Sequence, residues 1–108
     1  MRIGKDYLSS LQDGRTVLID GERVDDVTTH PAFAPVATVI AELYDIAADS
    51  SNGMQYVAPE TGETANRVFG IPRSAIDLAA RRAAIQKWAS HTHGWLGRSP
   101  DHVGTFLA

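Results

Sequence analysis

The first apolar positions of the chain recur at helical spacing. In residues 5–13 (KDYLSSLQD), the side chains of Tyr7, Leu8 and Leu11 fall on one side of a helix, which predicts a short helix over this range. Gly14 follows directly and suits the left-handed conformation in which many helices end. The chain is therefore expected to begin with a short helix that has a small apolar face.

The next pattern is typical of β-strands. In residues 16–24 (TVLIDGERV), two β-prone arms flank Asp20-Gly21, a dipeptide that tolerates positive φ and suits a two-residue type I′ turn. This predicts a hairpin over about residues 16–25. A second, looser hairpin is predicted where MQYVA (54–58) and NRVFGI (66–71) are joined through PETGET (59–64).

Two longer segments again show helical periodicity. Pro35 suits the first position of a helix over about residues 35–48, whose apolar face would contain Val36, Ile40, Leu43 and Ala47. A further helix is predicted over about residues 75–95, with Ser74 as its cap. The apolar side chains expected to share its buried face are Leu78, Ile85, Trp88, Thr92 and Trp95.

The end of the pattern predicts one more helix and a missing neighbour. Ser99, Pro100 and Asp101 suit the cap and first turn of a helix over residues 100–108. A helix of about eight residues does not persist alone in water. Because this one is cut off, we expect another segment or chain to cover it.

Composition and charge narrow the class of protein. The chain has 108 residues, 44% of them hydrophobic, and is long enough for a single unit, 1–108, which we expect to be mainly α with one or two short β-hairpins. The net charge of -3 argues against nucleic acid as a partner. There is no cysteine, no apolar run long enough for a membrane span and no signal-peptide pattern, so we expect a cytoplasmic protein.

The stretch HTHGWLGRSPDH (91–102) holds most of the candidate chemistry. His91 and His93 are two positions apart and point away from each other on a helix, so we expect packing or surface roles for them and no metal site. Trp88 and Trp95 lie seven apart on one face, which favours packing over a stacking platform for a ligand. No GxSxG nucleophile motif and no glycine-rich phosphate loop occurs.

Arg98 and His102 are the candidate site residues. Arg98 lies where one helix ends at glycines and the next begins at Ser-Pro-Asp, a position in which a guanidinium at a cavity edge favours an anion. His102 follows one helical turn later and offers a hydrogen bond or a proton-transfer group near neutral pH. A solvated loop arginine is the alternative reading of Arg98.

The sequence resembles a known family over essentially its whole length, from about Gly4 to Ala108. The segments KDYLSSLQDGRTVLIDGERVDDVTTHPAF, IAELYD, PRSAIDLAARRAAIQKWA and GWLGRSPDH resemble the N-terminal region of the oxygenase component of 4-hydroxyphenylacetate 3-hydroxylase and its relatives. These are two-component, FAD-dependent aromatic monooxygenases. The resemblance implies the N-terminal helical part of a longer enzyme with an acyl-CoA-dehydrogenase-like fold.

The resemblance also implies partners and site residues. A larger chain would carry the central β-domain, the C-terminal helical bundle and most FAD contacts, and a separate flavin reductase would supply reduced FAD. Arg98 matches the arginine of the family motif GRxPDY that contacts the phenolic substrate. His102 stands where that motif has tyrosine, which implies a different aromatic or heteroaromatic substrate.

Our leading hypothesis is therefore a subunit or fragment of a reduced-flavin-dependent aromatic monooxygenase, inactive alone. It would contribute Arg98 and His102, as catalytic and substrate-binding residues, to a site completed by the larger chain of a heteromeric complex. The alternatives are a structural docking subunit that does not contact substrate, and a flavin-dependent oxidation or rearrangement on the same scaffold. A related branch of dehydratases uses cysteine ligands for an iron–sulfur cluster, and this chain has none.

Overall fold

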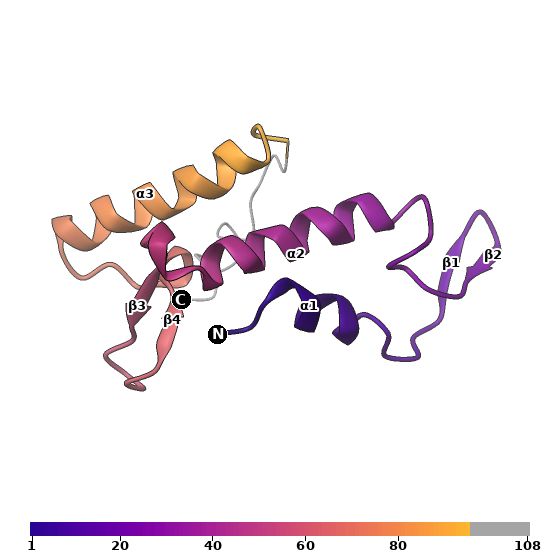
Figure 1. Cartoon of the computed structure of the whole chain (residues 1–108), viewed down its shortest axis with the longest axis horizontal. Helices are drawn as coiled ribbons and strands as arrows, with labels where there is room; N and C mark the ends of the chain where they lie inside the picture. The colour runs from indigo at the N-terminus through magenta and orange to yellow at the C-terminus, as the bar shows by residue number, and fades with distance from the viewer. Residues whose placement is uncertain (96–108) are drawn as a thin grey trace. The chain divides into compact units, whose positions relative to one another are not determined.

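The computed structural model describes residues 1–95, and they form a mainly helical structure with two short antiparallel hairpins (Figure 1). The predicted fold class is confirmed. The elements in chain order are α1 (Gly4–Ser10), β1 (Val17–Ile19), β2 (Glu22–Val24), α2 (Ala34–Ala48), η1 (Ser50–Asn52), β3 (Gln55–Val57), β4 (Thr64–Asn66), η2 (Arg67–Phe69) and α3 (Ala75–His91), where η marks a 3-10 helix. Within these residues no helix combines the length and apolarity that a membrane crossing requires.

The chain divides into two compact units, Arg2–Asp45 and a second unit that begins at Ile46. Helix α2 crosses this boundary and so contributes residues to both. That residues 1–108 act as one unit stays a prediction, and the helix predicted over residues 100–108 lies outside the described residues.

The hairpin of the first unit lies within the predicted range. Strands β1 and β2 pair with Ile19 opposite Glu22, which leaves Asp20 and Gly21 as the two-residue turn. Both turn residues have positive φ, 50° and 83°, as a type I′ turn requires. Local sequence chemistry is therefore sufficient to place this turn.

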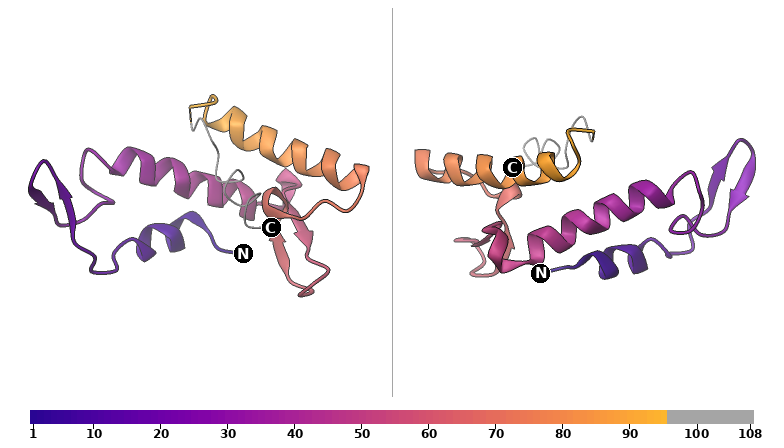
Figure 2. Two further views of the ribbon diagram at one scale, coloured as in Figure 1. Left: turned by 180° about the vertical axis from the view of Figure 1, so that it is seen from behind. Right: turned by 45° about the horizontal axis from the view of Figure 1, so that its top comes forward.

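Helix α1 lies beside α2 in all three ribbon views (Figures 1 and 2). The Gly4 amide donates a hydrogen bond to Asp45 Oδ1 at 2.8 Å, across 41 positions of sequence. A Cβ atom on Gly4 would lie 2.5 Å from the Ala41 carbonyl oxygen, so glycine is required for this approach. The rings of Tyr7 and Tyr44 stack with centroids 5.2 Å apart, and thereby join the middle of α1 to α2.

The end of α1 differs from the prediction. The helix ends at Ser10, with Leu11 as its cap, so Gly14 is not the residue that terminates it. The Leu11 and Gln12 amides instead donate to the carbonyls of Leu8 and Ser9, which closes the last turn locally. Gly14 has a φ of +78° in the loop that follows.

The second hairpin also differs from the prediction. Strand β4 comprises Thr64–Asn66 and pairs with β3 in the register Gln55 to Asn66 and Val57 to Thr64, so residues 67–71 are not part of it. The Asn66 side chain accepts a hydrogen bond from the Val68 amide at 3.0 Å and thereby starts the 3-10 turn η2. A cap of this kind competes with strand pairing and ends the hairpin early.

Helix α3 and η2 enclose the core of the second unit. Met54 and Val68 are fully buried, and Ala84 and Trp88 are buried on α3. Trp88 is contacted edge-on by Phe69 at 5.8 Å between ring centroids, and Arg81 Nε donates to the Val68 carbonyl at 2.9 Å. Ser74 caps α3 as predicted, since its Oγ accepts from the Asp77 amide at 3.1 Å.

Candidate functional site

Both sequence-predicted site residues, Arg98 and His102, lie outside the described residues. Their assignment therefore stays a prediction. The structure does describe the start of the same corner, from the last turn of α3 to Trp95.

This corner begins with a helix end built around a histidine. Helix α3 ends at His91, four residues earlier than the predicted end near residue 95. The Gly94 amide donates to the Ala89 carbonyl at 2.9 Å and the His93 amide to the Ser90 carbonyl at 3.3 Å, the paired bonds of a Schellman motif. His93 has a φ of +52°, so it occupies the left-handed position that glycine usually takes.

The two described histidines of the corner lie at the surface. His91 and His93 are both exposed, in line with the surface role expected for them. Among residues 1–95 no group of three His, Cys, Asp or Glu side chains lies close enough to hold a metal ion. Because His102 lies outside that range, the expectation of no metal site stays a prediction.

The two tryptophans differ in environment. Trp88 is 5% exposed and belongs to the core, whereas Trp95 is 89% exposed because α3 ends before it. The prediction that both pack on one helical face is therefore wrong for Trp95. Leu78, expected on the same face, is 57% exposed.

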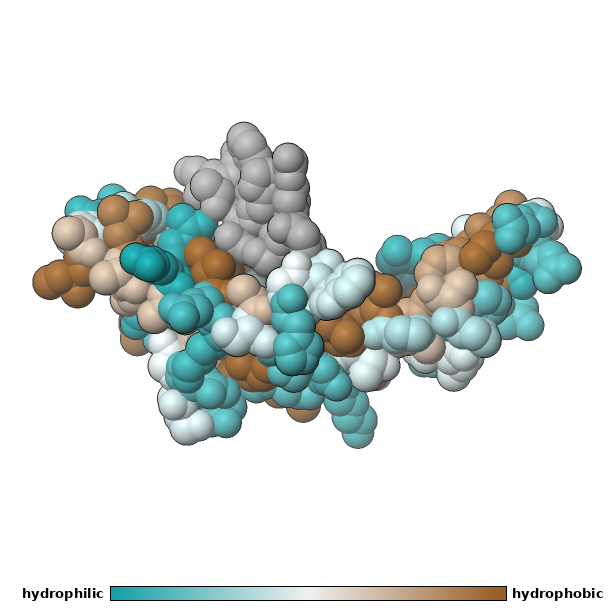
Figure 3. Space-filling model, turned by 90° about the horizontal axis from the view of Figure 1, so that it is seen from above, coloured by the Kyte–Doolittle hydropathy of each residue, from teal (hydrophilic) through white to brown (hydrophobic). Residues whose placement is uncertain are grey.

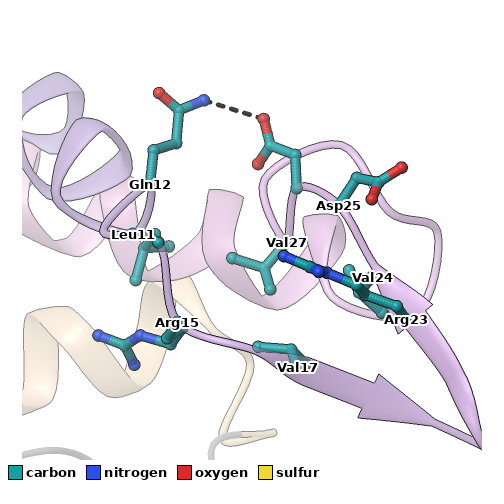
Figure 4. A pocket seen from close by; sticks show the side chains of 10 residues that line it. Leu11, Gln12, Arg15, Val17, Arg23, Val24, Asp25 and Val27 are labelled. Atoms are coloured by element: carbon teal, nitrogen blue, oxygen red, sulfur yellow. Dashed lines mark hydrogen bonds between the residues drawn. The ribbon is translucent and has the colours of Figure 1, made fainter.

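A cavity of about 280 Å³ lies in the first unit between the end of α1 and the β1–β2 hairpin (Figure 4). Gln12 closes one side through a hydrogen bond of 2.9 Å from its Nε2 to Asp26 Oδ2. Side chains at its wall include Leu11, Val17, Val24 and Val27, together with Arg15, Arg23 and Asp25.

Two of the four charged side chains at this cavity, Arg15 and Asp26, form contacts within the unit. Asp26 Oδ1 accepts from the Thr28 hydroxyl at 2.6 Å and the Thr28 amide at 2.8 Å, and these bonds, with that from Gln12, lower the pKa of Asp26. Arg15 forms an ion pair with Asp13, and its hydrogen bonds hold the pKa of that carboxyl at about 2. These contacts fix the loop around the hairpin and leave neither carboxylate available as a proton acceptor near neutral pH.

A second cavity, of about 340 Å³, lies in the second unit where the β3–β4 hairpin meets the start of α3. The Arg67 guanidinium lies 5.4 Å from the Tyr56 ring centroid and donates to the Gln55 carbonyl at 3.1 Å. At the other wall Arg73 pairs with Glu60, and the Arg73 amide donates to Asp77 Oδ2 at 3.1 Å.

The sequence pattern does not predict that Arg67 lies at this cavity, because it places Arg67 in the second strand of the hairpin. The sequence does contain a signal for a turn at this point. Asn66 directly precedes Arg67, and an asparagine side chain favours capping the turn that follows it. The two cavities described above contain no serine or histidine at their walls. Neither of these two cavities therefore brings a serine or histidine nucleophile together with a base.

Comparisons with known proteins connect this fold to one family. A family model described as "4-hydroxyphenylacetate 3-hydroxylase N terminal" matches residues 3–108. The chain is 46% identical over 106 residues to the Streptomyces globisporus protein named (3S)-3-amino-3-(3-chloro-4-hydroxyphenyl)propanoyl-[peptidyl-carrier protein SgcC2] monooxygenase, covering 96% of this chain and 20% of that one. It is 47% identical over 107 residues to the oxygenase component of a Rhodococcus 4-nitrophenol 2-monooxygenase, covering 96% and 21% respectively.

Solved structures give the same likeness. The oxygenase component HpaB of 4-hydroxyphenylacetate 3-monooxygenase, in complex with FAD and 4-hydroxyphenylacetate, matches with a TM-score of 0.82 and 35% identity, over 95% of this chain and 22% of that one. An archaeal 4-hydroxybutyryl-CoA dehydratase from N. maritimus matches with a TM-score of 0.70 and 31% identity, over 82% and 18%. The chain thus spans about a fifth of the length of the relatives that it matches.

Proposed function

This chain belongs to the 4-hydroxyphenylacetate 3-hydroxylase family, and we propose that it is the N-terminal part of a reduced-flavin-dependent monooxygenase that hydroxylates a phenolic or other electron-rich aromatic substrate. The observation that carries the proposal is the match of nearly the whole chain, at 46% and 47% identity, to two enzymes named as monooxygenases of phenol-bearing compounds. The family resemblance noted in the sequence is confirmed by the same match.

The remaining four-fifths of the oxygenase completes the active site in this proposal. The name "oxygenase component" of several relatives supports a separate reductase as the source of reduced flavin. An FAD complex of HpaB supports FAD as the cofactor. Neither cavity described above is lined by a glycine-rich phosphate loop, so we assign the contacts to FAD mainly to the remainder of the enzyme.

Arg98 and His102 carry this chain's share of the chemistry in the proposal. Arg98 binds the acidic oxygen of the substrate and stabilises it as a phenolate, which makes the ring more nucleophilic. His102 holds or deprotonates the ring hydroxyl.

The overall reaction is a hydroxylation with molecular oxygen. Reduced FAD, when bound, supplies the two electrons with which one atom of O₂ becomes water while the other enters the ring as a hydroxyl group. The residues of this chain orient the ring and stabilise its developing charge, and the buried core at Trp88 holds α3 in place for that purpose.

The test is the R98A substitution in the complete oxygenase, whether that is one polypeptide or this chain with a second one. Loss of charge stabilisation should lower the hydroxylation rate by roughly one to three orders of magnitude with FAD binding unchanged. R98K, which keeps the charge but loses the bidentate geometry, should fall between R98A and the unaltered enzyme. Unchanged turnover in both R98A and H102A would instead support a docking role without substrate contact.

The likeness to the dehydratase makes a different reaction on the same scaffold the second candidate. Incubation under ¹⁸O₂ separates the two, because a monooxygenase product gains one labelled oxygen atom. An oxidised or rearranged product without the label would contradict hydroxylation and support the second candidate.

A further inference from the structure

The first turn of α3 is surrounded by apolar side chains that the second unit leaves exposed. Ile76 is 80% exposed and Leu78 57%, and Phe69 and Ile71 lie on the segment that leads into the helix. We call Phe69, Ile71, Ile76 and Leu78 the α3-start surface. Apolar colour is visible in Figure 3 on the part of the second unit where α3 begins.

From these residues we infer that the α3-start surface is the docking surface for the remainder of the oxygenase, the four-fifths of the relatives' length that this chain does not contain. The inference rests on the proposed function, because it takes the family's full-length enzyme as the partner. It adds the location at which that partner covers this chain.

The first argument is the mismatch between the apolar pattern of α3 and its core. The predicted apolar stripe of α3 includes Leu78, Ile85 and Trp88, but of these three side chains the core buries only Trp88, together with the neighbouring Ala84. Ile85 is half-buried and Leu78 exposed, so the buried stripe stops short of the apolar stripe. Large exposed apolar side chains that are concentrated around one helix turn, here the first turn of α3, are typical of an interaction site.

The second argument is the state of the polar groups among these side chains. Ser74 accepts from the Asp77 amide, Asp77 accepts from the Arg73 amide, and Arg73 pairs with Glu60. Each of these groups already has a hydrogen bond or an ion pair inside the unit. A domain that covers this surface would therefore bury no charge without a compensating contact. The surface is thus prepared for burial.

The third argument favours the remainder of the enzyme over a second copy of this chain. Ile76 and Leu78 are two positions apart and point to different flanks of the helix. An occupant that covers both must reach around the first turn of α3. A larger, enclosing domain does this more readily than a self-complementary patch on an identical chain.

Alkylation of single introduced thiols in the complete oxygenase tests the inference, and the natural absence of cysteine from this chain keeps the background in its peptides at zero. L78C and I76C are compared with T61C, an exposed position in the polar turn between β3 and β4. Peptide mass spectrometry measures the iodoacetamide reaction rate in native and in denatured enzyme. We expect native protection of at least about tenfold for L78C and I76C, and less than about threefold for T61C.

Equal native rates for L78C, I76C and T61C would overturn the inference. Protection that disappears on dilution while the complete oxygenase stays assembled would identify a second copy of this chain as the occupant and also overturn the inference. If the substituted enzymes do not assemble, hydroxyl-radical footprinting of Ile76 and Leu78 in the unaltered oxygenase reads the same two side chains. Hydroxylation is measured on each sample, so an active enzyme with open thiols contradicts only the docking surface, and a protected but inactive one contradicts only the proposed function.

Discussion

The unit Arg2–Asp45 and the unit that begins at Ile46 both bury apolar side chains, such as Leu43 and Met54, but the first also has a carboxylate bond to a distant backbone amide. In the first, carboxylates of Asp45 and Asp26 accept backbone amides and hold α1, α2 and the hairpin loop. In the second, Met54, Val68 and Trp88 form an apolar core against α3. The two units also differ in charge. The first unit has eight carboxylates and four basic side chains, whereas residues 46–95 have four carboxylates and five basic side chains.

The difference teaches where a partner is needed. The first unit leaves three large apolar side chains exposed, Ile3, Leu18 and Val36, whereas the second unit has more large apolar side chains than its core covers. Six of them, Val57, Phe69, Ile71, Ile76, Leu78 and Trp95, are exposed between residues 57 and 95. Excess apolar surface therefore belongs mainly to the unit that leads to the predicted substrate residues Arg98 and His102.

The largest expected effect is a difference in stability between alanine substitutions of the two tryptophans. W88A should lower the free energy of unfolding by about 3–5 kcal/mol, because it empties a buried position that contacts the Phe69 ring. W95A should change it by less than about 0.5 kcal/mol, because that ring is exposed in this chain. Urea melts of the 108-residue chain followed by circular dichroism measure both, and equal effects would refute the different roles of the two rings.

A smaller effect is expected at the closest approach of the first unit. G4A should destabilise the chain by about 1–3 kcal/mol, since the added Cβ collides with the Ala41 carbonyl and the Asp45 carboxylate. This cost outweighs the gain of up to about 1 kcal/mol that alanine normally brings to a helix. K5A, at the exposed next position, is the matched control and should be nearly neutral in the same melts.

The smallest effect is a local response to acid in the first unit. The pKa of Asp26 is lowered mainly by the Thr28 hydroxyl bond, so its stabilisation of the loop is present above the ordinary value of about 4 and is lost as the pH falls through the lowered pKa. The protection factor of the Thr28 amide, which corrects for the pH dependence of intrinsic exchange, should therefore fall as the pH drops below about 4. D26N should show faster exchange at neutral pH and less change with acid, and NMR measures both.

Asp13 provides the internal control for that titration. Its carboxyl should titrate near pH 2, because Arg15 holds its pKa at about 2. R15Q should return the midpoint toward the ordinary value, with little change in stability since the pair is exposed. A midpoint that does not move would show that Arg15 is not the cause.

The sequence by itself determined the features that depend on neighbouring residues. Asp20-Gly21 sets the β1–β2 turn because both residues tolerate positive φ, and Ser74 starts α3 because its hydroxyl accepts the amide three residues on. The long motifs also determined the family, which a match over residues 3–108 confirms. These signals act over a few residues or through similarity, so no knowledge of packing is required.

Only the tertiary structure decided features that depend on distant or competing contacts. Gly4 is required because Asp45 and Ala41 approach it across 41 and 37 positions of sequence, and η2 replaces the second strand because Asn66 caps Val68. Periodicity marks Leu78 and Trp88 alike as apolar, since it records which side chains prefer burial. Which of them the unit itself buries is decided by packing against η2, and this difference located the α3-start surface.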